Sequence, residues 1–208
     1  MAFDYKKEYK EFYMPKNKPS IVDIPKMNYI ALRGKGNPNE ENGEYGKSVE
    51  MLYSIAYTIL YKGNYKIDGY FDYVVPPLEG FWWIDGIKGM DYSKKDELNF
   101  ISIIRLPDFV KEKDFKWAID EATKKKKTDF SKVEFLTYEE GLCVQCMHLG
   151  PYDDEPKTVK LMEDYAREKG YKIDITDNRY HHEIYLNDPR KCEPDKLKTV
   201  IRHPIKEI

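Results

Sequence analysis

Hydrophobic residues recur at two spacings along the chain, and the spacing separates the expected helices from the expected strands. Three- and four-residue spacing predicts one helix over 45–62, ended by Gly63, a second from about 108 or 114 to 125, and a third from about 153 to a stop at Gly170. The apolar stripe of the first helix is Val49, Leu52, Ile55, Ala56 and Ile59. That of the second is Phe115, Ala118, Ile119 and Ala122, and that of the third is Val159, Met162, Tyr165 and Ala166.

Shorter apolar runs bounded by Gly and Pro predict strands. They cover 21–33 with an interruption near Pro25, then 70–75, 78–84, 100–106, 142–149, 180–187 and 197–202. Pro76 and Pro77 separate the second run from the third, because proline cannot sit inside a central ladder. The first twenty residues, rich in Lys and Tyr, are expected to form an arm fastened to the body.

The order strand, helix, strand, strand occurs twice, which predicts an internal duplication. The segments after the first and third helices even share letters, Gly63-Asn-Tyr-Lys-Ile-Asp68 against Gly170-Tyr-Lys-Ile-Asp174. We therefore predict an α+β fold of one domain over 1–208, with module one at about 21–106, an inserted helix at about 108–127 and module two at about 141–204. Antiparallel sheets would carry the helices on one side and leave a ligand groove between the modules.

Composition narrows the class of function. The chain is 41% hydrophobic and 35% charged, with a net charge of −2, so it should be globular and should have no field that gathers nucleic acid or an anionic membrane. No window is apolar enough to span a bilayer, and the N-terminus has no signal-like apolar stretch, so a cytoplasmic location is expected. No segment offers a helix-turn-helix. Direct nucleic-acid binding is therefore not expected, and a separate DNA-binding partner is left open.

The main candidate for chemistry lies in the strand within 179–189. Alternation places His181, Glu183 and Tyr185 on one face and apolar neighbours on the other. An acid in the middle of a strand is often only a solvated surface residue, but the 18 Tyr, 9 Phe and 3 Trp of the chain supply aromatic walls. A poorly solvated carboxylate there would need a partner, which makes Glu183 the candidate catalytic residue.

Metal, redox and nucleotide sites are not expected. Cys143 and Cys146 have the spacing of a redox pair, but on a strand they point to opposite faces, which favours structural thiols. The four histidines form no helical pair, so we predict neither a metal nor another cofactor. Gly46-Lys47-Ser48 lacks the earlier glycine of a phosphate-binding loop. The Tyr53, Tyr57 and Tyr61 stripe on the first helix is expected to flank the core or form a rim.

Four separated motifs carry a resemblance to a known family. They are Leu78-Glu-Gly-Phe-Trp-Trp83, Met147-His-Leu-Gly-Pro-Tyr-Asp-Asp-Glu-Pro156, His182-Glu-Ile-Tyr-Leu-Asn-Asp-Pro-Arg190 and Leu197-Lys-Thr-Val-Ile-Arg-His-Pro204. In this order they resemble the stand-alone GyrI-like small-molecule-binding proteins, which share their fold with the effector domains of AraC- and MerR-type multidrug-responsive regulators. The departures are Phe81, where Leu is common, and Cys143 and Cys146 in a strand that is usually aliphatic.

The resemblance implies a pseudo-twofold pair of modules around an aromatic groove, with Glu183 as the acid on the penultimate strand. Some stand-alone members are hydrolases that open the cyclopropane of duocarmycin-class DNA alkylators by adding water. The implied partner is thus a small aromatic, often cationic molecule.

Two functions stay open. In the first, a binding protein holds aromatic and often cationic ligands by ring stacking and the Glu183 charge. In the second, Glu183 orients or deprotonates water, or hands on a proton, while Tyr73 or Tyr185 polarises a carbonyl. Only one of the successive Trp82 and Trp83 can face the groove. The candidate ligand-binding residues are Tyr73, Glu79, Trp82, Trp83, Trp117, His148, Tyr152 and Tyr185.

Overall fold

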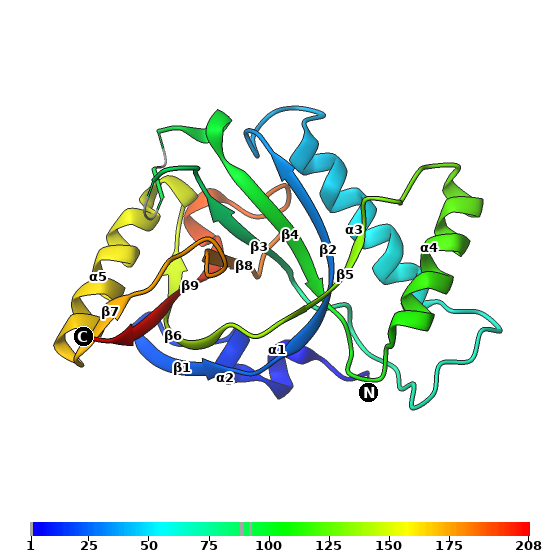
Figure 1. Ribbon diagram of the computed structural model, residues 1–208, viewed down its shortest axis with the longest axis horizontal. Helices are drawn as coiled ribbons and strands as arrows, with labels where there is room; N and C mark the ends of the chain where they lie inside the picture. The colour runs from blue at the N-terminus through cyan, green and yellow to red at the C-terminus, as the bar shows by residue number, and fades with distance from the viewer. Residues whose placement is uncertain (1, 88–89, 92) are drawn as a thin grey trace.

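One antiparallel sheet of nine strands organises the chain, with helices packed on it (Figure 1). The computed structural model describes every residue except 1, 88–89 and 92. The strands are β1 Ser20–Ile24, β2 Met27–Lys35, β3 Leu78–Trp83, β4 Asn99–Arg105, β5 Glu134–Tyr138, β6 Gly141–Leu149, β7 Tyr171–Ile173, β8 His181–Tyr185 and β9 Lys198–Glu207. The α-helices are α1 Tyr5–Glu8, α2 Lys10–Tyr13, α3 Glu44–Leu60, α4 Glu112–Lys126 and α5 Glu155–Glu168. This mixture confirms the α+β class.

The strand order is nearly symmetric about the middle of the sheet. It runs β1-β6-β9-β8-β3-β4-β2-β5, with β7 paired to β9. In chain order, β2, α3, β3 and β4 make one half, and β6, α5, β8 and β9 make the other, so β3 and β8 meet at the centre. The arrangement agrees with two strand-helix-strand-strand units, while their proposed limits stay a prediction.

The strand predicted over 70–75 was wrong. In this segment only Tyr73 forms a β-bridge, with Phe3, and the backbone bonds are Phe3 N–H to Asp72 O and Val74 N–H to Phe3 O, both 2.8 Å. Gly69, with φ of 74°, turns the chain just before the segment, and two prolines without N–H groups follow it. The third and fourth elements of the first half are therefore β3 and β4.

The sheet bends strongly because short links join its distant parts. Ile24 and Met27 are three residues apart and can be separated by at most about 11 Å. Yet β1 and β2 lie six strand spacings apart along the sheet, about 29 Å if it were flat. The link between β5 and β6 imposes the same bend from the other side. The strand before each half therefore pairs with the other half: β1 pairs with β6, and β5 pairs with β2. The β5 strand was not predicted from sequence.

Both large repeat helices lie on the same face, which we call the helix face. A row of paired residues across five strand junctions defines it: Leu32, Ser102, Gly80, Glu183, Ile201 and Cys146. Leu52 and Ile55 of α3 pack in one apolar cluster with Leu32, and Met162 and Ala166 of α5 pack in another with Cys146. Figure 1 shows α3 and α5 at opposite ends of the sheet, with β3 and β8 between them.

The N-terminal arm covers the opposite face, which we call the arm face. The predicted arm contains two short helices, α1 and α2, and buries Tyr5 and Tyr13. The backbone carbonyl of Phe12 accepts a hydrogen bond from Arg202 at 2.8 Å, and that of Glu11 accepts one from Gln145 at 2.6 Å. Both faces of the central strands are therefore buried.

The inserted helix α4 packs beside α3, outside the symmetric order. In the first turn of the helix, the Asp114 carboxylate accepts a hydrogen bond from the Lys111 N–H at 2.9 Å, as in a capping box. Across the residues that the structure describes, none of the helices has the length and apolar character needed to cross a membrane.

Candidate functional site

Glu183 lies at the centre of the helix face with only 7% of its surface exposed. As the alternation predicted, His181 and Tyr185 share its face. His181 Nε2 is 2.9 Å from Glu183 Oε1, and the Tyr185 hydroxyl donates to Oε2 at 2.8 Å. The pairing of Gly80 with Glu183 leaves the carboxylate facing a position without a side chain. An acid at the centre of the sheet is thereby held by side chains of its own strand.

Hydrogen bonds keep Glu183 ionised despite its burial. Burial raises the pKa of the carboxyl, but the hydrogen bond and the charge interaction of His181, together with hydrogen bonds from Tyr185 and Glu155, outweigh it and hold the pKa below its usual value. His181 Nδ1 in turn contacts His203 Nε2 at 2.6 Å. Burial, and then the neighbouring His181, lower the pKa of His203 far below the usual range, so His203 is neutral. A neutral His203 bonded to His181, and His181 bonded to Glu183, thus form a chain of contacts from β9 to the carboxylate.

Aromatic side chains surround the acid. Trp82 Nε1 donates to the Tyr185 hydroxyl at 2.9 Å, and the Tyr45 ring lies 5.1 Å from the Trp82 ring. The Tyr152 ring meets the Tyr185 ring edge-on at 5.9 Å. A side chain on Gly80 would place its Cβ 2.6 Å from Trp82 Nε1, so glycine is needed for Trp82 to reach Tyr185. We call Trp82, Tyr45, Tyr152 and Tyr185 the aromatic wall.

A second acid, Glu155 at the start of α5, completes the cluster. It is fully buried and hydrogen-bonds Glu183. In the described part of the chain, Glu155, His181 and Glu183 form the group of His, Cys, Asp and Glu with donor atoms close enough for a metal ion, all within 4.8 Å. The sequence test for helical His pairs could not detect it, since its members come from a strand and a helix start. His181 and Glu155 each hydrogen-bond Glu183 directly, and we assign no metal to this group.

Four of the predicted site residues join Glu183 on the helix face. Trp82, Tyr152 and Tyr185 belong to the aromatic wall. His148 lies on the same face but is fully engaged, because Nδ1 bonds Thr158 Oγ1 at 2.8 Å and Nε2 bonds the Pro151 carbonyl at 3.0 Å. It fastens the loop before α5.

The other four predicted residues lie elsewhere. Glu79 and Trp83 point to the arm face, where Trp83 lies at the rim and bonds Asp85 at 3.2 Å. Tyr73 packs in the cluster of Tyr5 and Tyr13. The Trp117 ring stacks on the Tyr65 ring, with the ring centres 4.0 Å apart. Glu79 and Trp83 lie on the opposite face from Glu183 because side chains alternate along each strand. Tyr73 packs against the N-terminal arm, whose position could not be predicted from the sequence.

The arm face holds a second buried cluster of acids and bases. His182 lies between Glu79 Oε2 at 3.0 Å and Glu140 Oε1 at 3.1 Å, and Arg202 bonds Glu140 Oε2 at 3.0 Å. Burial raises the pKa of Glu140, but His182 and Arg202 outweigh it and bring the pKa to about 2. Burial lowers the pKa of His182, but Glu140 and Glu79 outweigh it and raise the pKa above its usual value. Two acids and two bases therefore compensate one another here.

Sequence reasoning missed Tyr45, Glu155, His203, Glu140 and Arg202. The signal for Glu155 was its place before Pro156 in a motif already noted, and the signal for His203 was its alternation with Ile201 on β9. Glu140 gave no signal, because the link between β5 and β6 brings it to the arm face.

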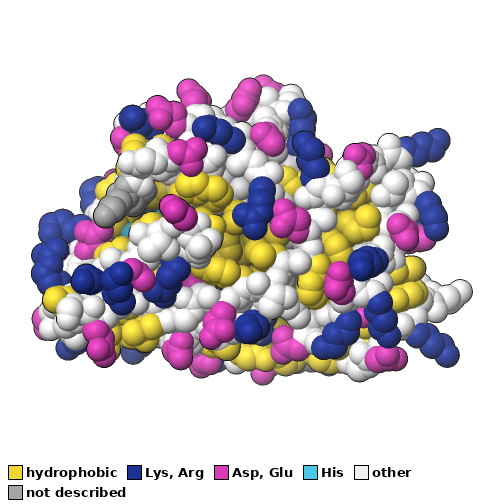
Figure 2. Space-filling view, viewed as in Figure 1, with side chains coloured by type: hydrophobic (Ala, Val, Ile, Leu, Met, Phe, Trp, Pro, Cys, Tyr) yellow, Lys and Arg dark blue, Asp and Glu magenta, His cyan; other side chains and the backbone are white. Residues whose placement is uncertain are grey.

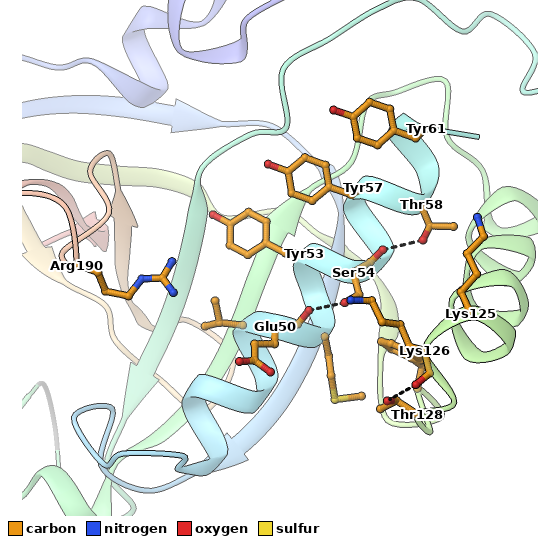
Figure 3. Close-up of a pocket in the computed structure, with 13 residues that line it drawn as sticks. Glu50, Tyr53, Ser54, Tyr57, Thr58, Tyr61, Lys125, Lys126, Thr128 and Arg190 are labelled. Atoms are coloured by element: carbon orange, nitrogen blue, oxygen red, sulfur yellow. Dashed lines mark hydrogen bonds between the residues drawn. The ribbon is translucent and has the colours of Figure 1, made fainter. Parts of the chain in front are cut away.

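A groove lies elsewhere, along the outer side of α3. It has a volume of about 590 Å³, and Figure 3 shows Tyr53, Tyr57 and Tyr61 in a row along one side of the helix, with Lys125 and Lys126 on the other. The tyrosine rings stack at 6.1 and 6.0 Å, and Tyr57 and Tyr61 are exposed. The stripe is thus a rim, as predicted.

Charge is mixed over the visible surface. Figure 2 shows basic and acidic side chains interspersed around a central patch of apolar ones. This face therefore has no single-sign patch of the kind that attracts a nucleic-acid backbone.

Comparison with known proteins now identifies the family. The model of the GyrI-like small molecule binding domain matches residues 17–206. The chain belongs to this family. A structure described as a hydrolase from Listeria innocua is similar over 99% of this chain and 100% of its own, with 46% identity and a TM-score of 0.89. An uncharacterized conserved protein from Listeria innocua has the same coverage, 47% identity and a TM-score of 0.92. No curated protein sequence matches the chain.

The fold of this GyrI-like protein also occurs in a more distant structure. The EcmrR C-terminal domain is similar over 92% of this chain and 98% of its own, with a TM-score of 0.56 and 14% identity. At that identity the likeness concerns the fold alone. It agrees with the predicted relation to effector domains.

Proposed function

We propose that this GyrI-like protein binds planar aromatic compounds against the aromatic wall and adds water to a bound, strained electrophilic ring, with Glu183 as the base. One observation carries the proposal. Glu183 is a buried, ionised carboxylate whose donors are an imidazole, a phenol and a carboxyl, in aromatic surroundings. No Lys or Arg is among these donors, so the charge is available to a ligand or to water. The 46% identity to a hydrolase supports the choice of hydrolysis.

The chemistry follows from the lone pairs of the carboxylate. Each oxygen accepts two hydrogen bonds, so Glu183 can hold a water molecule while keeping its bond to His181. In a cyclopropane conjugated to a carbonyl, the water oxygen forms a bond to a ring carbon while one ring C–C bond breaks. The electron pair moves to the carbonyl oxygen, the water proton passes to Glu183, and Glu183 then hands that proton on to the carbonyl oxygen and is ionised again. The net change is the addition of one water.

Tyr185 is placed to assist at the carbonyl. Its hydroxyl accepts from Trp82 and donates to Glu183, and a ligand carbonyl can replace Glu183 as its acceptor. Burial and then the Glu183 charge raise the pKa of Tyr185 well above its usual value, so it acts as a neutral donor. Tyr73, the other candidate, packs with the arm and has no such role in the proposal.

Binding without turnover is the second candidate, because an ionised carboxylate beside Trp82 and Tyr45 also suits a lipophilic cation. Stacking and cation–π contacts contribute on the order of 0.5–2 kcal/mol each. In the hydrolase candidate, turnover of a neutral electrophile depends on the charge of Glu183. In the binding candidate, the affinity for a cation depends on it.

One experiment tests the proposal and separates the candidates. The purified chain is incubated with a neutral cyclopropane-bearing aromatic electrophile and, separately, with a lipophilic cation, while mass spectrometry follows water addition and calorimetry follows binding. Glu183→Gln keeps the shape and removes the charge. We expect turnover to fall by roughly 10²–10⁴ while the neutral compound still binds.

Glu207→Gln, at an exposed position near the end of β9, is the matched control and should behave as the wild type. Loss of cation affinity in Glu183→Gln without any wild-type turnover would favour the binding function. Unchanged turnover and cation affinity in Glu183→Gln would remove Glu183 from the site altogether.

A further inference from the structure

Two carboxyl groups meet beneath the aromatic wall. Glu155 begins α5 and is fully buried, and its carboxyl hydrogen-bonds that of Glu183 on β8. The donor atoms of both, with His181 Nε2, lie within 4.8 Å of one another. An ionised carboxylate offers only acceptors, so two carboxyl groups can share a hydrogen bond only when one carries a proton. The pair must therefore contain a proton.

The surroundings decide which group is protonated. Glu183 accepts from His181 and Tyr185, and these bonds stabilise its anion. A proton on Glu155 adds a third donor to that anion. If both groups were ionised, two buried charges would repel at close range, as in carboxylate dyads that hold one proton between them.

We propose that Glu155 is a positioning residue that stays protonated at neutral pH and donates its proton in a hydrogen bond to Glu183, so that the pair carries one negative charge. Its effect on turnover rests on the proposed function, whereas the protonation of Glu155 does not.

The groups that face the pair from the packed elements are neutral donors at working pH or are already engaged. Tyr185 on β8, Tyr45 on α3 and Tyr152 before α5 have pKa values raised first by burial. His203 on β9 is neutral and bonded to His181, and His148 on β6 bonds Thr158 and Pro151. His181 on β8, which contacts both Glu183 and His203, is the remaining group beside the pair.

Two substitutions of Glu155 separate a proton donor from an anion. Glu155→Gln keeps a neutral donor toward Glu183, so turnover and ligand affinity should stay close to the wild type. Glu155→Leu removes the donor, so the pKa of Glu183 should rise, the acid limb of the pH–rate profile should move to higher pH, and turnover at neutral pH should fall on the order of tenfold to a hundredfold. The wild type should also lose activity at alkaline pH as the pair loses its proton, and Glu155→Gln should lack that alkaline limb.

Infrared spectroscopy gives a readout independent of turnover. At neutral pH the wild type should show the C=O stretch of a buried protonated carboxyl, sensitive to deuterium, and Glu155→Gln should lose it while the Glu207→Gln control keeps it. A band that persists in Glu155→Gln would overturn the proposal, even if the protein proves to be a hydrolase. Stoichiometric binding of Zn²⁺ or Mn²⁺ that disappears in Glu155→Gln would also overturn it, since a metal would then replace the proton. If the variant does not fold, a titration of ¹³C-glutamate-labelled wild type must show one carboxyl that stays protonated above neutral pH.

Discussion

Two adjacent residues of β8 begin two different buried clusters, one on each face of the sheet. His182 points to the arm face, where Glu140 bonds both His182 and Arg202. Glu183 points to the helix face, where its donors are an imidazole, a phenol and a carboxyl. Both acids have lowered pKa values, but fixed cations lower that of Glu140 and mainly hydrogen bonds lower that of Glu183.

The difference separates a structural charge from an available one. On the arm face each charge has a protein partner of the opposite sign, so a broken pair leaves an uncompensated buried charge. On the helix face the negative charge has no Lys or Arg donor, so a ligand cation or a proton from water can use it. A lowered pKa alone would not distinguish the two sites; the chemical type of the donors does.

The largest effect should come from removing a cation on the arm face. Arg202→Met leaves Glu140 with His182 alone and frees the Gln145 and Phe12 acceptors. We expect the free energy of unfolding to fall by about 3–5 kcal/mol, measured by urea denaturation. A loss below about 1 kcal/mol would show that the arm-face cluster is dispensable for stability.

The second largest effect should be a difference between the two tryptophans of β3 when each is replaced by alanine. Trp82 is 3% exposed and bonds Tyr185, so Trp82→Ala should cost about 3–5 kcal/mol of stability and also abolish binding of aromatic ligands. Trp83 is half-buried at the arm-face rim, so Trp83→Ala should cost less and leave affinity unchanged. Equal affinities in the two variants, measured by calorimetry, would break the distinction between the faces.

The histidines of the two faces should give opposite pH dependences. His203 has a lowered pKa, so stability should fall as pH decreases below about 6.5, where the unfolded histidine takes up a proton. His182 has a raised pKa, so its contribution is complete below about 6.5 and is lost as pH rises through the raised value. Stability should therefore peak near pH 6.5, with a further loss below the usual carboxyl range as the pH approaches the Glu140 pKa of about 2.

Urea denaturation across this pH range measures the curve. His203→Gln should flatten the acid side of the peak and leave the alkaline side in place. If the variant flattens the alkaline side instead, the charge states assigned to the two faces are reversed.

The smallest effect should come from Trp117, whose ring stacks on Tyr65 in the cluster around α4. Trp117→Ala should lower the free energy of unfolding by about 1 kcal/mol through the lost stacking. Ligand affinity should stay within twofold of the wild type. A large loss of affinity would return Trp117 to the candidate site.

Local patterns predicted the parts of the site that lie within one element. Alternation placed His181, Glu183 and Tyr185 together, and helical spacing gave α3, α4 and α5. Register between strands could not be read from one sequence, so the burial of Glu79 against His182 was missed. Glu140 and Glu155 depend on a crossing link and on the docking of α5, which are properties of the assembled sheet. Residues 70–75 looked like a strand, but the turn at Gly69 and the two following prolines left them with a single bridge.

The most direct test of the comparison is a matched pair, Glu183→Gln and Glu140→Gln, each measured for unfolding in urea and for turnover of the cyclopropane electrophile. We predict that Glu183→Gln stays within about 1 kcal/mol of wild-type stability and loses roughly 10²–10⁴ in turnover. Glu140→Gln should lose about 3–5 kcal/mol of stability, because His182 and Arg202 remain buried without their shared anion, while its folded fraction keeps turnover. The reverse pattern, with Glu183→Gln unfolded and Glu140→Gln inactive but stable, would contradict the account.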